Sequence, residues 1–207
     1  EVSSHSLVQA RINGIPFKVF CFTNLSQDHL DYHKDMEAYF QAKLSIIDIL
    51  SIDTKIIVNI DDEYGKIFFT EATNRGFKVE TIGYSDIANV KLRVTKGTPG
   101  IQFIEIVKSD WVYKFQTHLI GEFQAANLGM ALLTCESFGF KFDELVCFCD
   151  TVKPVPGRLE FVGKTKKGAL VYIDFAHTPD ALKNLLEALK GLTKGKLILV
   201  FGAGGER

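Results

Sequence analysis

The feature that most constrains the fold is a change of pattern near residue 89. Before it, two short apolar runs, at 55–60 and 77–84, are separated by a helical stretch at 66–75 that closes on a glycine. A strand, a helix and a second strand in this order are typical of layered α/β proteins. After it, three alternating segments between residues 89 and 119 are separated by Gly-Thr-Pro-Gly and Ser-Asp turns, which predicts an antiparallel meander. We therefore expect an α/β fold with a mixed sheet.

Further helices are predicted on both sides of this region. One begins at Asp35, whose carboxylate is placed to cap it, and carries apolar residues at helical spacing as far as Leu50. Two others cover residues 122–138 and 143–151, the second with Asp143 as its cap. The sequence thus predicts helices that cover the sheet.

The last fifty residues show a different order of elements. The predicted elements are a hairpin (158–164 and 169–174), a helix from Pro179 to Gly191 capped by Thr178, and a buried strand (196–201). Such an order opens a second α/β domain. A proline-rich segment at 153–157 precedes it and is the candidate linker. We expect one domain at 1–153 and the first part of another at 154–207.

Charge and hydropathy exclude several classes of protein. Lys and Arg total 24 and Asp and Glu total 25 in a chain of 207 residues, and no window is rich in one sign, so nucleic-acid and anionic-membrane binding are not expected. No apolar run approaches the roughly 18 residues that span a bilayer, and we expect a cytoplasmic monomer with free cysteines. Because the chain begins with Glu1 and stops inside a glycine-rich turn, we expect the natural protein to continue on both sides.

The segment Asp-His-Leu-Asp-Tyr-His at 28–33 places four possible metal ligands in six residues, just before a predicted helix. One interpretation is a metal site, since His and Asp are common ligands. The other is an Asx-rich turn that caps the helix. The segment alone leaves both open.

Lys43 lies in the middle of the apolar stripe of the helix that begins at Asp35. A lysine among apolar neighbours loses hydration, so its pKa falls and a neutral amine becomes available. A neutral amine can take up carbon dioxide, and the resulting carbamate would be an anionic oxygen ligand suited to Mg²⁺. The alternative is a lysine whose stem packs on the helix while its tip reaches water.

Residues 1–11 gather polar groups of several kinds. Glu1, Ser3 and their neighbours offer a carboxylate, hydroxyls and an imidazole in what is predicted as a turn, although such a turn can simply cap a helix. Gln9 and Arg11 follow two residues apart, and an arginine there could clamp a phosphate or carboxylate or lie on the surface.

Two glycine-containing segments look like nucleotide motifs but do not fit them. Gly163-Lys164-Thr165 resembles the end of a P-loop, yet the earlier glycine is too far away and a strand follows. The glycine-rich turn after residue 201 begins like a dinucleotide fingerprint, but Arg207 stands where its last glycine is required. We therefore do not expect a dehydrogenase.

Taken together, the motifs resemble the Mur ligase family in order and nearly from end to end. They are EVSSHSL (1–7), FTNLSQDHLDYH (22–33), AK (42–43), NIDDEYG (59–65), PGRLE (156–160), DFAHTPDAL (174–182) and VFGAGGER (200–207). The resemblance implies a three-domain enzyme, of which this chain holds the second part of the central P-loop-type ATPase domain and the first part of a Rossmann-like C-terminal domain. The P-loop itself is absent, so the chain alone is expected to be inactive.

The nearest resemblance within the family is to ligases that add the third amino acid to UDP-MurNAc-L-Ala-D-Glu in peptidoglycan synthesis. It implies that ATP phosphorylates the D-glutamyl carboxylate and that the amine of a diamino acid attacks the acyl phosphate, with ATP and Mg²⁺ as cofactors. We expect meso-diaminopimelate as that amino acid, with L-lysine as the other option.

The resemblance also implies roles for individual residues. Those implied for Mg²⁺ are Glu1, His29 and Lys43, the last as a carbamate, with His29 and Lys43 also expected to serve catalysis. Those implied for substrate are Ser3, Gln9, Arg11 and Arg207, the last for the carboxylate of the incoming amino acid. Those implied for the nucleotide are Asn127, Arg158, Asp174 and His177. The chain departs from the family at 121–124, where Gly-Glu-Phe-Gln replaces the usual Gly-Arg/Lys-Phe-Asn.

Two other classes of function remain as alternatives. One is a non-catalytic nucleotide-binding or scaffold module of the same fold, against which the joint presence of Glu1, His29 and Lys43 argues. The other is a metal-dependent hydrolase built on residues 28–33, which lacks the second histidine cluster that such a site needs.

Overall fold

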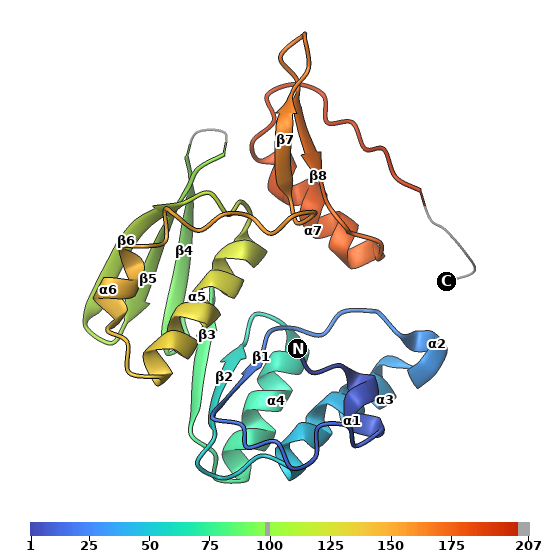
Figure 1. The fold of residues 1–207 in the computed structure, drawn as a ribbon, viewed down its shortest axis with the longest axis vertical. Coiled ribbons are helices and arrows are strands. Elements are labelled where there is room, and N and C mark those ends of the chain that lie inside the picture. Colours follow the sequence, from blue (N-terminus) through green and yellow to red (C-terminus); the bar gives the residue numbers. More distant parts are fainter. Residues whose placement is uncertain (98–99, 203–207) are drawn as a thin grey trace.

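The computed structural model describes residues 1–97 and 100–202 and contains two sheets (Figure 1). The larger has the strand order β1-β2-β3-β4-β5-β6, and the smaller consists of β7 and β8. Strands β1 (Val19–Phe22), β2 (Lys55–Asn59), β3 (Val79–Gly83) and β4 (Val90–Lys96) pair in parallel. Strands β5 (Gln102–Lys108) and β6 (Trp111–Thr117) continue the sheet in antiparallel register. The predicted mixed α/β fold is confirmed.

Strand β2 is buried on both faces, which explains its unbroken apolar sequence. Ile56 and Val58 belong to one core cluster, whereas Ile57, between them, belongs to another. Successive side chains of a strand point to opposite faces, so β2 separates two hydrophobic cores. Helices α3 (Met36–Leu44) and α4 (Glu63–Asn74) contribute to the first core, and α5 (Glu122–Ser137) contributes to the second (Figure 1).

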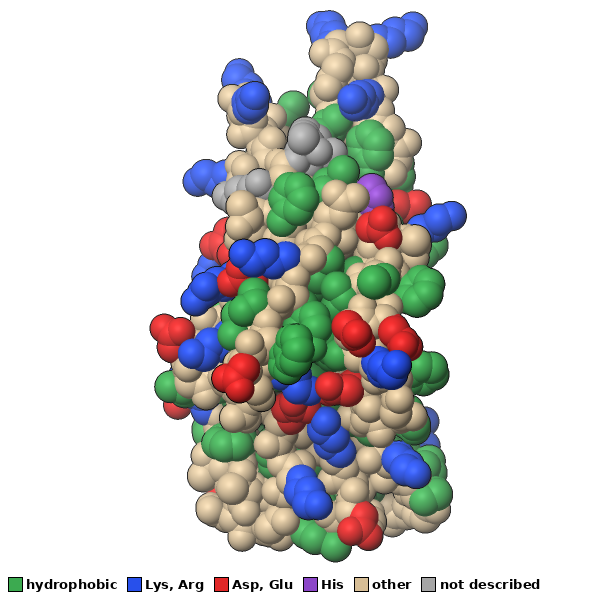
Figure 2. All heavy atoms as spheres, turned by 90° about the vertical axis from the view of Figure 1, so that its left-hand side faces the viewer, with side chains coloured by type: hydrophobic (Ala, Val, Ile, Leu, Met, Phe, Trp, Pro, Cys, Tyr) green, Lys and Arg blue, Asp and Glu red, His purple; other side chains and the backbone are tan. Residues whose placement is uncertain are grey.

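The meander has one buried face. In β5 the side chains of Gln102, Ile104 and Ile106 are buried, whereas Phe103 between them is 48% exposed. This period of two is the alternation that the sequence predicts. Figure 2 shows the side of the molecule that carries β6 and α6 (Phe142–Val146), where hydrophobic side chains lie among charged ones.

Two predicted helix caps are confirmed. The carboxylate of Asp35 accepts the N–H of Ala38 at 2.7 Å, and the hydroxyl of Thr178 accepts the N–H of Ala181 at 3.3 Å. Within the described residues, no helix has the length and apolar character needed to cross a membrane. The remaining helical elements are α1 (Ser4–Val8), α2 (Leu30–His33), a 3-10 turn (Ser45–Asp48) and α7 (Pro179–Lys190).

Several predicted boundaries are wrong. Helix α4 begins three residues earlier than predicted because Asp62 caps it, accepting the N–H of Gly65. Asp143 does not cap α6: it lies in the first turn, and the helix ends at Val146 rather than at residue 151. The chain turns there, and Cys149 packs into the core with 1% of its surface exposed. The helix from Asp35 tightens to 3-10 geometry after Leu44.

The C-terminal part contains the predicted hairpin and helix but not the predicted strand. Strands β7 (Glu160–Lys164) and β8 (Leu170–Ile173) pair antiparallel, and α7 packs beside them (Figure 1). Residues 196–201 form no strand, and Ile198 and Val200 are 80% and 91% exposed. A strand needs a neighbour for its backbone hydrogen bonds, and among the described residues β7 and β8 pair only with each other. The apolar pattern alone therefore did not produce a strand.

Gly65 allows α4 to start directly above the end of β2. A Cβ at this position would lie 2.0 Å from the backbone oxygen of Asn59. We predict that Gly65→Ala lowers the free energy of unfolding by about 1–3 kcal/mol, because backbone rather than a flexible side chain must move. Urea unfolding provides the measurement. Gly195→Ala, which has no atom within 4 Å, is the matched control, and equal losses in both variants would contradict the prediction.

Candidate active site

Three short helices meet around the ring of Tyr39. The Nζ atom of Lys43 lies 5.4 Å from the ring centroid, and the ring of His29 meets it edge-on at 6.0 Å. His33 stacks on the same ring at 5.0 Å with an interplanar angle of 19°. Tyr39 itself is 6% exposed. Helix α1 packs on α3, and Ser4 at its start forms a hydrogen bond with His33. We call this junction of α1, α2 and α3 the Tyr39 corner (Figure 1).

Lys43 is half-buried in this corner, as its position in the apolar stripe predicted. Burial lowers the pKa of its ammonium below the ordinary value, while the negative charges of Glu1 and Asp28 act in the opposite direction. Both carboxylates therefore interact electrostatically with the amine of Lys43. The structure thus brings together Glu1 and Lys43, which are far apart in the sequence.

The donor set of the corner can be tested against a hard divalent cation. Within residues 1–97 and 100–202, no three His, Cys, Asp or Glu side chains come together as a metal site. An ammonium at Lys43 would repel a metal ion, whereas a carbamate there would add an anionic oxygen to Glu1 and His29. The residues fit Mg²⁺ only when Lys43 carries that group.

The first residues of the chain form a capped helix. Ser3 is the N-cap of α1, and its hydroxyl accepts the N–H of Ser6 at 3.2 Å. The cap interpretation of this segment is therefore confirmed, and a substrate role for Ser3 stays a prediction. Gln9 ends the helix, and both Gln9 and Arg11 are exposed. Their side chains lie at the surface, accessible to a ligand.

The predicted nucleotide residues of the C-terminal part gather around Phe175. The guanidinium of Arg158 lies 5.3 Å from the Phe175 ring centroid, and the ring of His177 meets it at 5.2 Å. Both carboxylate oxygens of Asp174 are engaged by backbone: Oδ2 accepts the N–H of Leu159 and Oδ1 that of Ala176, each at 2.7 Å. Asp174 thus ties the start of the hairpin to its end and so places Arg158 and His177 together.

Two predicted residues remain, Asn127 and Arg207. Asn127 is exposed on α5, in its second turn. Arg207 lies outside the described residues. The role expected of Asn127 toward the nucleotide stays a prediction.

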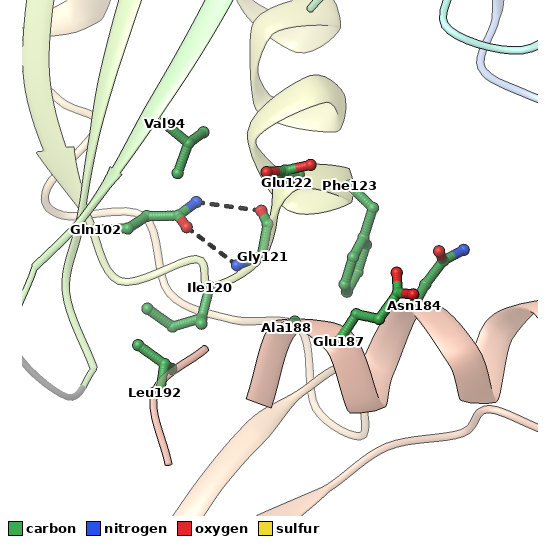
Figure 3. A pocket seen from close by; sticks show the side chains of 10 residues that line it. All are labelled: Val94, Gln102, Ile120, Gly121, Glu122, Phe123, Asn184, Glu187, Ala188 and Leu192. Carbon is green, nitrogen blue, oxygen red and sulfur yellow. Dashed lines mark hydrogen bonds between the residues drawn. The ribbon is translucent and has the colours of Figure 1, made fainter. Parts of the chain in front are cut away.

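A pocket that the sequence did not predict lies where the two parts of the chain meet. It has a volume of about 290 Å³ and is lined by side chains from the meander, from the start of α5 and from α7 (Figure 3). The amide of buried Gln102 donates to the Gly121 carbonyl at 3.2 Å and accepts the Gly121 N–H at 3.0 Å. Gly121 has a φ of 102°, which a side chain would resist. Glu122, one of the departures from the family pattern, lines this pocket, whereas none of the predicted site residues does.

Sequence reasoning also did not identify Tyr39, His33 and Ser4, which form the buried side of the Tyr39 corner. Tyr39 precedes Lys43 by four residues, one helical turn, so helical spacing contained a signal for their contact. The contact between His33 and Ser4 joins residues 29 positions apart, and the pairing of Gln102 with Gly121 joins residues 19 apart. No local pattern indicates either of these.

Comparison with known proteins matches both parts of the chain. Residues 1–135 match the Mur ligase middle domain, and residues 157–207 match the Mur ligase glutamate ligase domain. The chain belongs to the Mur ligase family.

Its similarity to individual Mur ligases extends over its whole length. A protein of Synechococcus elongatus and one of Aquifex aeolicus are 38% and 42% identical to it, and both are named UDP-N-acetylmuramoyl-L-alanyl-D-glutamate--2,6-diaminopimelate ligase. The chain spans 41% of the length of each.

Solved Mur ligase structures share the fold. One, described as a UDP-N-acetylmuramoyl-L-alanyl-D-glutamate--2,6-diaminopimelate ligase, has a TM-score of 0.78 and 31% identity, and the match covers 100% of this chain and 42% of that one. The MurF ligase of Thermotoga maritima in complex with ADP has a TM-score of 0.76 at 20% identity, covering 91% and 42%. The second likeness concerns the fold alone.

The two backbone hydrogen bonds of Asp174 lead to a prediction for this Mur ligase chain. Asp174→Asn keeps one acceptor oxygen but turns an NH₂ group toward the other backbone N–H. We expect the free energy of unfolding to fall by about 1–3 kcal/mol, as for the loss of a hydrogen bond to a charged group. Thermal unfolding followed by circular dichroism measures it, with exposed Asp53→Asn as the control. An unchanged stability would show that these bonds contribute nothing.

Proposed function

We propose that the protein to which this chain belongs is an ATP-dependent ligase. In this proposal it joins meso-diaminopimelate to the D-glutamyl carboxylate of UDP-MurNAc-L-Ala-D-Glu in peptidoglycan synthesis. The observation that carries the proposal is the half-buried amine of Lys43 beside Tyr39, Glu1 and Asp28. The names of the relatives, which match this chain along its full length, support diaminopimelate over lysine as the amino acid.

Lys43 prepares the site through its own chemistry. Burial favours the neutral amine, whose lone pair attacks carbon dioxide; a new N–C bond forms and the nitrogen loses a proton to water. The product is an anionic carbamate. Glu1, His29 and this carbamate would hold Mg²⁺, which when bound supplies positive charge to neutralise the phosphates of ATP.

Other residues bind and orient the reactants. Ser3, which precedes α1, and Gln9 and Arg11, which follow it, are proposed to hold the muramoyl dipeptide, so that its carboxylate faces the phosphate of ATP. Transfer of the terminal phosphate of ATP to the carboxylate gives an acyl phosphate and releases ADP. The incoming amine then attacks the acyl carbon, loses a proton and expels inorganic phosphate, which leaves the amide. A contact between Arg207 and the carboxylate of the incoming amino acid is proposed from the resemblance alone.

The C-terminal residues are proposed to act on the nucleotide. In this proposal Arg158 provides a permanent positive charge for the phosphates, Asp174 faces the ribose, and His177 lies beside the nucleotide. The two backbone hydrogen bonds of Asp174 hold the segments that carry Arg158 and His177. Asn127 would contact the adenine from the first domain. We place the boundary between the domains at residues 153 and 154, so that the nucleotide bridges them.

The proposal predicts that the full-length protein releases phosphate from ATP only when both the muramoyl dipeptide and diaminopimelate are present. Lys43→Ala should lower kcat by about 100-fold or more, because the anionic ligand is lost, and extra Mg²⁺ should restore little of it. A coupled phosphate-release assay measures both. Exposed Lys18→Ala is the matched control, and thermal unfolding verifies that each variant folds. Near-normal activity of Lys43→Ala would contradict the carbamate role.

The same protein tests the alternative, a non-catalytic nucleotide-binding or scaffold module. Calorimetric titration with ATP and Mg²⁺ measures binding independently of turnover. Binding without phosphate release, in the presence of both substrates, would favour the scaffold.

A further inference from the structure

Helix α2 is a single turn that does not hold its own conformation. It comprises only Leu30–His33, and it is flanked by two non-glycine residues with positive φ, His29 at 55° and Lys34 at 69°. Isolated helical turns are unstable, and a left-handed conformation is unfavourable for residues with a side chain. The conformation therefore has to be imposed by contacts from outside the turn.

Tyr32 and His29 pack on the ring of His5 in α1, and His33 supplies the buried contacts. It is the one buried residue of α2, with 6% of its surface exposed. Its Nε2 atom forms a hydrogen bond of 2.8 Å with the Oγ atom of Ser4, which is itself 1% exposed. This bond joins α2 to the first residue of α1. Because both groups are removed from water, loss of either one leaves the other buried without this partner.

His33 also connects α2 to α3. Its ring stacks on Tyr39, the same ring that lies beside Lys43 and His29. Its backbone N–H donates to the carbonyl of His29 at 3.0 Å, which closes the turn. One side chain thus contacts all three helices of the Tyr39 corner.

We propose that His33 is a positioning residue that fixes His29 and the start of α1 relative to Lys43. The inference rests on the proposed function, because it gives His29 and Glu1 their role toward Mg²⁺. His29 is 43% exposed and has a left-handed backbone, and its ring has only edge-on contacts with His5 at 5.0 Å and Tyr39 at 6.0 Å. The buried anchor of its turn is therefore His33. Groups that orient metal ligands typically alter metal affinity about 10–100-fold when removed.

The test compares His33→Leu with His33→Gln in the full-length protein. Leucine fills the space without a hydrogen bond, whereas glutamine can place its Nε2 amide near Ser4. We expect His33→Leu to raise the Mg²⁺ concentration for half-maximal phosphate release about 10-fold or more, with the KM for diaminopimelate unchanged. His33→Gln should restore most of the Mg²⁺ response. The control is His118→Leu, the same change at an exposed histidine of the meander.

A second variant separates the hydrogen bond from packing. Ser4→Ala should weaken the Mg²⁺ response to a similar degree, and the double variant Ser4→Ala/His33→Leu should be little worse than either single one. Additive effects, or an unchanged Mg²⁺ response in His33→Leu despite a lower unfolding temperature, would overturn the inference and leave His33 a packing residue.

A readout that does not depend on turnover distinguishes failure of the inference from failure of the proposed function. With ¹³C-bicarbonate, the wild-type protein should show a carbamate resonance that sharpens with Mg²⁺, together with a Mg²⁺-dependent rise in unfolding temperature. Both responses should shift to higher Mg²⁺ in His33→Leu. If wild-type protein shows these responses without ligating its substrates, the proposed function fails while the positioning role stands. Absence of any Mg²⁺ response in the wild type would overturn both.

Discussion

Burial of Tyr39 is the constraint on which the candidate active site depends. The ring occupies the junction of α1, α2 and α3, and it excludes water from one side of Lys43. Loss of hydration lowers the pKa of the lysine, whereas the carboxylates of Glu1 and Asp28 oppose that change. Burial is the larger of the two effects, so the pKa of the amine is lowered on balance. Such a group is chemically suited to become an anion, because the carbamate exchanges a poorly hydrated cation for a metal ligand.

The position of this corner follows from the sheet beneath it. The side chains of β2 alternate between two cores, so α3 and α4 cover one face while α5 covers the other. Gly65 lets α4 begin almost in contact with the end of β2. The ends of β2 and β3 are joined by Asp61, whose carboxylate accepts the N–H of Tyr84 at 2.7 Å. The hydroxyl of Tyr84 donates to the Glu122 carbonyl at the start of α5. The sheet and α5 are therefore connected by a hydrogen bond as well as by packing.

The sequence correctly predicted the elements that a local pattern of apolar and polar residues defines. The buried run of β2, the alternation of the meander and the caps of α3 and α7 were all correct because each depends on neighbours in the sequence. The strand at 196–201 failed because a ladder requires a partner that the pattern does not contain. Strand β1 was not predicted, because its four residues are too few to show a pattern and form a strand only by pairing with β2.

Some residues of the candidate site carry a local sequence signal, and others do not. Lys43 could be identified because it is a charged residue among the apolar residues of its helix. His29 could be identified because residues 28–33 contain four possible metal ligands. Which histidine of that segment faces inward could not be predicted, since it is decided by Ser4 and Tyr39. His33 is anchored to both, and His29 is left half-exposed in a left-handed turn.

The junction between the two parts of the chain depends on contacts of the same long-range kind. Ile120 and Phe123 pack with Leu159 and Leu185 in a small hydrophobic cluster, separate from the two cores of the sheet. The Gln102 amide holds Gly121 at the start of α5, immediately beside that cluster. At both the junction and the Tyr39 corner, one buried polar side chain is hydrogen-bonded beside a backbone segment with positive φ, at Gly121 in the first and at His29 in the second. A substitution at Gln102 or His33 would shift the neighbouring backbone without removing a residue that contacts a ligand. Sequence motifs are defined by ligand-contacting residues, so they do not identify such positioning residues.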